Sequence, residues 1–433
     1  MGPLQQKQPH QSSENVMTQQ ELRELFRRKA ELEVAVGVNA QPGQPVIIRS
    51  ETGQKEYVDQ LVECLKARGC GWIAFDWDDP RQQRKLLLEG TEEQIKHVRP
   101  EMKAIYERWF KENGVRIALD GDEFPGLLDD TDPNRRALFN SARREERDRY
   151  FNHVASFDLS QWLVTAHPTI GWANKVYTDL PESQRYNALV KDIATCMRLD
   201  APDPVAEWKS QRERLKNRSS ALNKLEIREL HFTGPGTDLK VRLSPLAMFE
   251  GGGSVAKNGI PFIANLPTEE VFTTPDWRGT EGKVRLTRPV VINDELVSGL
   301  HLEFKNGMIV GFHADTGQAA FEAHIAKEVS ARRLGEIALV GIDSRVFQTG
   351  RVFLCTLFDE NAASHAAIGN AYKKVLRGGT KMSESELDAV GCNVSTSVHD
   401  DMMISDRSVD VTARTASRIL VPILREGAWI LPV

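Results

Sequence analysis

Hydrophobic positions in the first half of the chain follow two different periods. The short apolar run QPVIIRS (44–50) predicts a strand, and YVDQLVECLKARG (57–69) has apolar residues at helical spacing. A second apolar run, GWIAFDWDD (71–79), completes a strand–helix–strand order that is typical of a parallel pair with a right-handed crossover. A helix over 92–113 and a strand over 115–122 continue the alternation, so we expect a layered α/β domain.

Charged helices dominate the pattern in the middle of the chain. DPNRRALFNSARREERDRYF (132–151) predicts a long helix whose charges face solvent. A second helix is expected from PDPVAEW (202–208) onward, because proline suits the first turn of a helix. We expect the large side chains of Trp162, His167 and Trp172 to pack in a core with these helices.

From residue 226 onward, short strands replace the helices. The turn Lys305-Asn306-Gly307 is typical of a tight antiparallel hairpin. Two helices are expected among the strands, one over 319–335 that Gly335 closes and one over 360–375. The predicted strands are IRELHFTG (227–234), TDLKVRLS (237–244), KVRLTRPVVIN (283–293) and the pair in LVSGLHLEFKNGMIVGFHA (296–314).

The change of pattern near residue 220 predicts two domains with different architectures. We assign residues 1–40 to a disordered tail and a lead helix, and 41–220 to an N-terminal α/β domain. Residues 221–433 form a C-terminal α+β domain with a largely antiparallel sheet. The length of 433 residues agrees with this division, since domains commonly hold about 100–200 residues.

Composition and charge exclude several classes of protein. With 56 Lys and Arg against 61 Asp and Glu, the net charge is −5 and the chain lacks the basic field of a nucleic-acid binder. No apolar stretch reaches the length of about 18 residues that a membrane span needs, and the polar N-terminus lacks a secretory core. We therefore expect a cytoplasmic protein. The five cysteines show no CxxC spacing, so a metal would be held by histidines and carboxylates.

Several familiar catalytic motifs do not occur in the sequence. The chain has no GxxxxGK[ST] phosphate loop, no HExxH and no GxSxG. Gly251-Gly252-Gly253 is a glycine run, but it lacks the strand-to-helix context of a phosphate-binding loop. Candidate chemistry must therefore come from dispersed acids and histidines.

The segment DENAASHAAIGNAY (359–372) carries the densest candidate chemistry. We expect a helix that begins near Asp359, with Glu360 in its first turn and with His365 and Tyr372 on one face. Small residues around these side chains leave room for a substrate or a metal. The alternative is an exposed helix start with a capping aspartate.

Further acids and a second histidine lie next to apolar runs. His399 and Asp401 are two residues apart and therefore on one side of a strand, where they either bind a divalent metal or form a buried hydrogen bond. Glu336 precedes another predicted strand, and Glu269 or Glu270 enters a third. A carboxylate in such a place is costly unless it is paired or metal-bound.

Two histidines and four or five carboxylates, on separate strand and helix ends, suit a pair of divalent cations. Two such cations about 3.5–4 Å apart deprotonate a bridging water and polarise a carbonyl. Tyr372 would then donate a hydrogen bond to the developing oxyanion. These residues predict a dinuclear hydrolase.

The same segments resemble the aminopeptidase T / aminopeptidase S family of metallo-aminopeptidases. The motifs that carry the resemblance are HFTGPGTDLKVRL (231–243), NLPTEEVFTTP (265–275), RRLGEIALV (332–340), LFDENAASHAAIGNAY (357–372), GCNVSTSVHDDMMI (391–404) and REGAWI (425–430). The first half resembles the family more loosely, so the resemblance covers about residues 40–433.

The resemblance implies a metal-dependent aminopeptidase that removes N-terminal residues from peptides through a water activated by two metals. The metal-binding C-terminal domain would hold two divalent ions per subunit (Zn, Co or Mn). A homodimer and a peptide substrate with a free N-terminus are also implied. The implied catalytic residues are Tyr372 and Glu336, and the implied metal ligands are Glu270, Glu336, Glu360, His365, His399 and Asp401.

The sequence also departs from the family pattern beside these motifs. Ser405-Asp406 stands where a Gly-Ser pair is usual, and VDVTARTAS (409–417) lacks the expected glycine turns. We expect both departures to shape the pocket, which keeps open a hydrolase specialised for an amide or peptide bond in a particular metabolite or precursor peptide. A non-catalytic binding protein on a degenerate peptidase scaffold is a third hypothesis, although no implied site residue is substituted.

Overall fold

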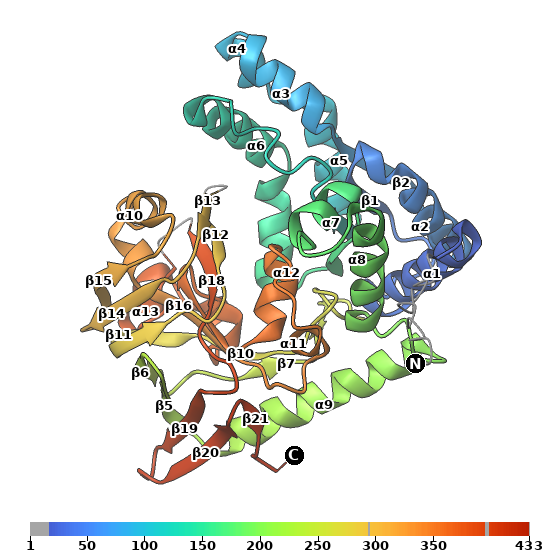
Figure 1. The fold of residues 1–433 in the computed structure, drawn as a ribbon. Coiled ribbons are helices and arrows are strands. Elements are labelled where there is room, and N and C mark those ends of the chain that lie inside the picture. The colour runs from blue at the N-terminus through green and yellow to red at the C-terminus, as the bar shows by residue number, and fades with distance from the viewer. Residues whose placement is uncertain (1–16, 293–294, 395–397, 433) are drawn as a thin grey trace, which may run out of the picture.

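A four-stranded parallel sheet forms the centre of the N-terminal half (Figure 1). The computed structural model describes residues 17–292, 295–394 and 398–432, so the tail predicted for residues 1–16 lies outside the described residues. β1 pairs in parallel with both β2 and β3, which confirms the predicted parallel pair. The strand order is β2-β1-β3-β4, with the bounds β1 (Val46–Glu51), β2 (Ile73–Asp78), β3 (Val115–Asp120) and β4 (Trp162–Ala166).

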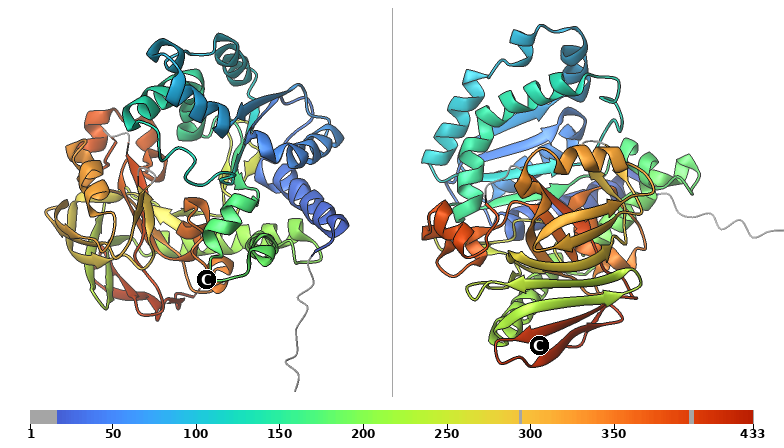
Figure 2. Two further views of the ribbon diagram at one scale, coloured as in Figure 1. Left: turned by 45° about the horizontal axis from the view of Figure 1, so that its top comes forward. Right: turned by 90° about the vertical axis from the view of Figure 1, so that its left-hand side faces the viewer.

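Helices cover both faces of this sheet (Figure 2). Successive residues of β1 point to opposite faces, so Ile48 packs in one core with Leu61 of α2 and Ile47 packs in another with Tyr106 of α5. The helices of this half are α1 (Gln19–Leu32), α2 (Lys55–Ala67), α3 (Pro80–Glu89), α4 (Glu92–Ile95), α5 (Pro100–Lys111), α6 (Pro133–Phe157), α7 (Ile170–Val176), α8 (Glu182–Cys196) and α9 (Pro204–Lys224).

The continuous helix predicted over 92–113 is wrong, because the chain forms α4 and α5 instead. Arg99 has φ −73° and ψ 107°, an extended conformation that the following proline favours. Pro100 then occupies the first turn of α5, where no backbone N–H is required. The predicted helices α6 and α9 are confirmed, and each also begins with a proline.

Two antiparallel sheets build most of the C-terminal half. The larger sheet has the strand order β15-β14-β11-β6-β5-β19-β20-β21, and the smaller has β18-β17-β16-β10-β7. Asn306 and Gly307 both have positive φ in the turn between β14 and β15, which confirms the predicted hairpin. The strands are β5 (Ile227–Gly234), β6 (Thr237–Leu243), β7 (Glu250–Gly251), β8 (Ser254–Val255), β9 (Pro261–Phe262), β10 (Val271–Thr273), β11 (Pro275–Arg285), β12 (Val290–Ile292), β13 (Glu295–Val297), β14 (His301–Lys305), β15 (Met308–His313), β16 (Leu334–Leu339), β17 (His365–Gly369), β18 (His399–Met403), β19 (Asp410–Thr415), β20 (Leu420–Arg425) and β21 (Ala428–Trp429).

Both helices predicted among these strands are corrected by the structure. The first is shorter than expected, and Gly335 lies inside strand β16 rather than at a helix end. The second is replaced by a short helix, a 3₁₀ turn (Glu360–Ala362) and strand β17. All residues of β16 and β17 are buried, so pairing in the middle of the sheet overrides the local helical spacing. The remaining helices are α10 (Gln318–Ile325), α11 (Arg345–Gln348), α12 (Thr356–Asp359) and α13 (Glu384–Ala389).

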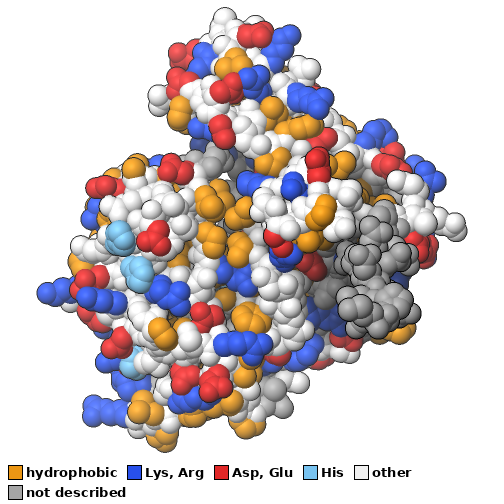
Figure 3. Space-filling model, viewed as in Figure 1, with side chains coloured by type: hydrophobic (Ala, Val, Ile, Leu, Met, Phe, Trp, Pro, Cys, Tyr) orange, Lys and Arg blue, Asp and Glu red, His pale blue; other side chains and the backbone are white. Residues whose placement is uncertain are grey.

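The two halves share packing, and the fold is mixed α/β. The core that contains the parallel sheet also takes in Phe353 and Phe358 from the C-terminal half. A parallel bridge joins Val164 of β4 to Asn265. Within the described ranges, no helix has the length and apolar character needed to cross a membrane. Acidic and basic side chains are interspersed over the face shown in Figure 3. The domain bounds given above stay a prediction.

Candidate metal centre

Four of the six predicted ligands lie on one face of the smaller sheet. The register sets Glu336 beside Ala367 and Ala367 beside Asp401, and directly paired residues point to the same face. His365 lies two residues from Ala367 on β17, and His399 lies two residues from Asp401 on β18. The predicted placement of His399 and Asp401 on one side of a strand is therefore confirmed, whereas His365 lies on a strand and not on a helix.

A β-bulge directs Glu336 into this face. The register of β16 against β17 shifts between Leu334 and Glu336, with Gly335 as the residue between them. A Cβ atom at Gly335 would lie 2.4 Å from the carbonyl oxygens of Gly369 and Asn370, so only glycine fits at this point. Bulges of this kind re-aim the neighbouring side chain.

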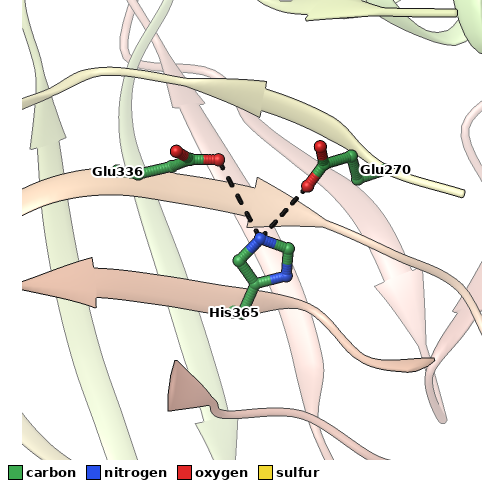
Figure 4. Close-up of side chains that lie close together, drawn as sticks. All are labelled: Glu270, Glu336 and His365. Carbon is green, nitrogen blue, oxygen red and sulfur yellow. Dashed lines mark ion pairs between the residues drawn. The ribbon is translucent and has the colours of Figure 1, made fainter. Parts of the chain in front are cut away.

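The acids and imidazoles form two overlapping groups of three. The Nε2 atom of His365 lies 3.1 Å from Glu270 Oε2 and 3.9 Å from Glu336 Oε1 (Figure 4). The Nε2 atom of His399 lies 3.7 Å from both Glu336 Oε2 and Asp401 Oδ1. We call Glu270–Glu336–His365 the first triad and Glu336–His399–Asp401 the second triad. The potential ligand atoms of each triad lie within 4.8 Å of one another, and Glu336 belongs to both.

Backbone carbonyls select the tautomer of both histidines. His365 Nδ1 lies 3.1 Å from the carbonyl oxygen of Ala363, and His399 Nδ1 lies 2.7 Å from that of Asn370. A carbonyl oxygen only accepts hydrogen bonds, so each Nδ1 carries the proton and donates it. Both Nε2 atoms therefore face the carboxylates as potential metal ligands, an arrangement typical of metal-binding histidines.

The charge of the cluster also fits cations. Burial raises the pKa of the Glu336 carboxyl well above its usual range, and the negative charges of Glu270 and Asp401 raise it further. Burial and the same two charges raise the pKa of Glu360. Burial lowers the pKa of His365, but its hydrogen bond to Glu270 and the surrounding carboxylates raise it overall, so a proton on Nε2 takes the place of a cation. Buried acids at this density are costly without a compensating cation, and the donor set fits divalent metals.

Glu269 and Glu270 have different surroundings, although the sequence leaves open which of the two carboxylates faces the site. Glu269 is buried and forms an ion pair of 2.8 Å with Arg198, and Gln211 donates a hydrogen bond of 2.7 Å to its other oxygen. Its backbone N–H donates to the side-chain oxygen of Asn361 at 2.6 Å. These contacts fix the segment that presents Glu270 to the first triad.

Tyr372 and Glu360 complete the predicted set at the edge of the triads. The Tyr372 ring lies edge-on to His399 with a centroid distance of 5.1 Å; the residue lines the cavity and is 41% exposed. Enclosure in the cavity and the nearby carboxylates raise the pKa of Tyr372, so its phenol keeps its proton. Glu360 also lines the cavity, but it lies outside both triads and accepts a hydrogen bond of 3.3 Å from Asn361 Nδ2.

A cavity of about 570 Å³ lies over this face and takes its walls from both halves of the chain. Trp162 packs against one core, as expected, and also lines the cavity. The sequence analysis missed Glu250 and Lys374, which line it too. The only sequence signal near them is the glycine run at 251–253, which forms part of the wall. The departures at 405–417 do not line the cavity, contrary to expectation; Ser405 Oγ instead accepts a hydrogen bond of 2.8 Å from the backbone N–H of Ser364.

Comparisons with known proteins agree with this geometry. A family model described as thermophilic metalloprotease (M29) matches residues 22–429. The chain is 34% identical to Aminopeptidase T of Thermus thermophilus over 408 residues, which cover 94% of this chain and 98% of the relative. It is 33% identical to Aminopeptidase AmpS of Bacillus subtilis over 400 residues, which cover 92% and 97%. The solved structure of wild-type AmpT from Thermus thermophilus matches with a TM-score of 0.87 at 32% identity, covering 94% of this chain and 100% of that one.

Proposed function

The chain belongs to the thermophilic metalloprotease family (M29) and is a hydrolase acting on peptides. We propose that it binds two divalent metal ions and uses them to remove N-terminal residues from peptides. The observation that carries this proposal is the sharing of Glu336 between two triads with both histidine Nε2 atoms turned inward. One triad would give a single ion three ligands, and the shared carboxylate suits a neighbouring pair.

Each ion has a set of potential ligands in the structure. Glu270, Glu336 and His365 would hold one ion, and Glu336, His399 and Asp401 would hold the other. When bound, two divalent ions would polarise the first peptide carbonyl and lower the pKa of a water for attack on it. Zn, Co and Mn all accept imidazole and carboxylate ligands, so each is a candidate.

The remaining residues of the set would handle protons and hydrogen bonds. Tyr372 keeps its phenolic proton and would donate a hydrogen bond to the oxygen that becomes negative in the tetrahedral intermediate. Glu336 is predicted both as a ligand and as the acceptor of the water's proton. Glu360, predicted as a ligand, is the alternative acceptor because it faces the cavity outside both triads.

Metal removal and restoration test the proposal. The protein is treated with a chelator, reconstituted with Zn²⁺, Co²⁺ or Mn²⁺, and assayed on leucine p-nitroanilide and on its N-acetylated form, with bound metal measured by elemental analysis. We expect activity only with metal, near two ions per chain, and no hydrolysis of the acetylated substrate.

Variants link the activity to the triads. His365→Ala and His399→Ala are each expected to lose bound metal and at least about a hundredfold in kcat, as is common when a catalytic group is removed. His313→Ala is the matched control, since this histidine is exposed on β15. Full activity in the double variant, or equal cleavage of the acetylated substrate, would contradict the proposal. The homodimer and the cytoplasmic location stay predictions.

A further inference from the structure

A carboxylate outside the triads faces the same cavity. Glu250 lies on β7 and pairs with Phe272 of β10, so its side chain shares the face that carries the predicted ligands. Among the described residues, none forms a hydrogen bond or an ion pair with the Glu250 carboxylate. A largely buried carboxylate without such a partner is costly, which points to a ligand that supplies one.

The charges around Glu250 favour a cation as that ligand. Lys374 attracts the Glu250 carboxylate, but its Nζ also lies 3.5 Å from Asp158 Oδ2 and 3.4 Å from Ser254 Oγ. Lys373 lines the cavity too, and its Nζ lies over the Phe157 ring, 4.4 Å from the centroid. The other oxygen of Asp158 is buried without a hydrogen-bond partner. Glu250 and Asp158 therefore share the ammonium group of Lys374. A cationic group of a substrate would pair with these carboxylates, whereas an anionic group would be repelled by them.

The position of Glu250 sets the length of the group that reaches it. β7 lies directly beside β10, which Glu270 of the first triad precedes, and two strands away from β16, which carries Glu336; neighbouring strands lie about 4.8 Å apart. The α-amine of a substrate is only two bonds from the carbonyl that the triads would hold, so it stays nearer the triads than the end of a long side chain does. The four-carbon stem of lysine or the similar stem of arginine suits the span.

The surface between Glu250 and the triads suits such a stem. Phe272 lies between them on β10, and aromatic rings pack well against the methylene groups of long cationic side chains. Beside Glu250, Gly252 and Gly253 have positive φ, and a Cβ atom at these positions would lie 2.4 Å and 2.3 Å from backbone oxygens. The glycine run therefore brings the chain close to its neighbours without filling the cavity with side chains.

We propose that Glu250, beside Asp158 and Lys374, binds the cationic side chain of an N-terminal lysine or arginine. This specificity subsite rests on the proposed aminopeptidase function and narrows its substrate class. The subsite acts through charge pairing with the first residue of the peptide, while the triads act on the bond that follows that residue.

The test compares substrates that differ in charge but not in length. Values of kcat/KM are measured for lysine and norleucine p-nitroanilides with the metal-loaded wild type, Glu250→Gln and Glu322→Gln. Glu322 is an exposed acid on α10 outside the cavity and serves as the matched control. We expect Glu250→Gln to lower the lysine-to-norleucine ratio at least tenfold, mainly through KM, with the norleucine value changed less than threefold. The control keeps the wild-type ratio.

Other outcomes overturn the proposal in distinguishable ways. If the wild type cleaves norleucine p-nitroanilide and the ratio is the same in Glu250→Gln, the subsite is absent while the aminopeptidase proposal stands. Equal losses on both substrates assign Glu250 to the α-amine or to structure, and also reject a side-chain subsite. If the metal-loaded wild type cleaves neither substrate, the proposed function itself fails. Competitive inhibition by lysinamide and norleucinamide gives the same comparison from binding alone.

Discussion

At the scale of single residues, the site depends on backbone atoms that hold the histidines. The carbonyls of Ala363 and Asn370 fix Nδ1 as the protonated nitrogen of His365 and His399. Side-chain partners of metal-binding histidines can be lost by substitution, but a backbone carbonyl remains as long as the fold does. The orientation of both rings is therefore a property of the sheet and of the turns at its ends.

Tyr372 gives the first prediction at this scale. Tyr372→Phe removes the phenolic O–H but keeps the ring that contacts His399 and Phe272 at centroid distances of 5.1 Å and 5.9 Å. We expect kcat to fall by about 10²–10³-fold, the usual effect of losing one oxyanion donor, with little change in KM. Steady-state kinetics on leucine p-nitroanilide measure the effect, and bound metal should stay at the wild-type level. A loss in kcat below threefold would remove Tyr372 from the reaction.

Glu51 gives a prediction about pH and stability. It ends β1, and burial raises its pKa to about 7 from the ordinary 4.5, although the backbone N–H of Glu123 donates to it at 3.1 Å. The folded state thus holds this proton more tightly than the unfolded chain does. The resulting stabilisation is complete below pH 4.5 and is lost as the pH rises through about 7.

The variant Glu51→Gln cannot ionise and keeps an oxygen for the hydrogen bond from Glu123. Its free energy of unfolding, relative to that of the wild type, is therefore expected to be higher at pH 8 than at pH 5. Urea unfolding at the two pH values measures this difference, and Glu322→Gln serves as the surface control. A relative stability that does not change with pH would show that Glu51 titrates normally in the folded protein.

At the scale of elements, the bulge in β16 is the feature most sensitive to substitution. Gly335→Ala places a Cβ atom 2.4 Å from two carbonyl oxygens, so the strand must shift and Glu336 must move with it. We expect a loss of about 1–3 kcal/mol in the free energy of unfolding, as in overpacked cores, together with weaker metal binding. Thermal unfolding and metal titration measure the two effects.

Gly311→Ala is the control for that experiment, because Gly311 also lies in a strand and a Cβ atom there meets Glu303 at 3.6 Å. This control should unfold near the wild-type temperature and bind metal normally. If both variants behave alike, the bulge does not determine the position of Glu336.

Elements with a clear period or turn chemistry were predictable from the sequence, but the strand that carries His365 was not. Alternation placed His399 and Asp401 correctly, and Asn306-Gly307 identified its hairpin. The segment around His365 is rich in alanine, which favours a helix locally, and only its burial between two other strands makes it a strand. The role of Glu269 was not predictable either, because it depends on an ion pair with Arg198, which is distant in the sequence.

At the scale of the whole molecule, metal binding and folding stability are expected to be linked. The triads bring together the residue that precedes β10 and residues of β16, β17 and β18, and the unfolded chain has no such arrangement. Ligand that binds only the folded state adds about 2.7 kcal/mol per site when its free concentration is 100 times Kd. Chelation should therefore lower the unfolding temperature by several degrees, as measured by calorimetry. The double variant His365→Ala, His399→Ala should show no such shift. If the wild type unfolds at the same temperature with and without the chelator, metal binding and folding stability are not linked.

The size of the cavity has a consequence for what the protein can degrade. Helix α6 and strand β4 face the smaller antiparallel sheet, which carries the triads, across a space of about 570 Å³. A space of this size holds a few residues of extended chain. A folded domain of 100 residues has a radius of gyration of about 13 Å, and its volume is at least roughly ten times larger than this space. A folded domain therefore does not fit into this space, and a substrate must present a chain end that is free to extend into it.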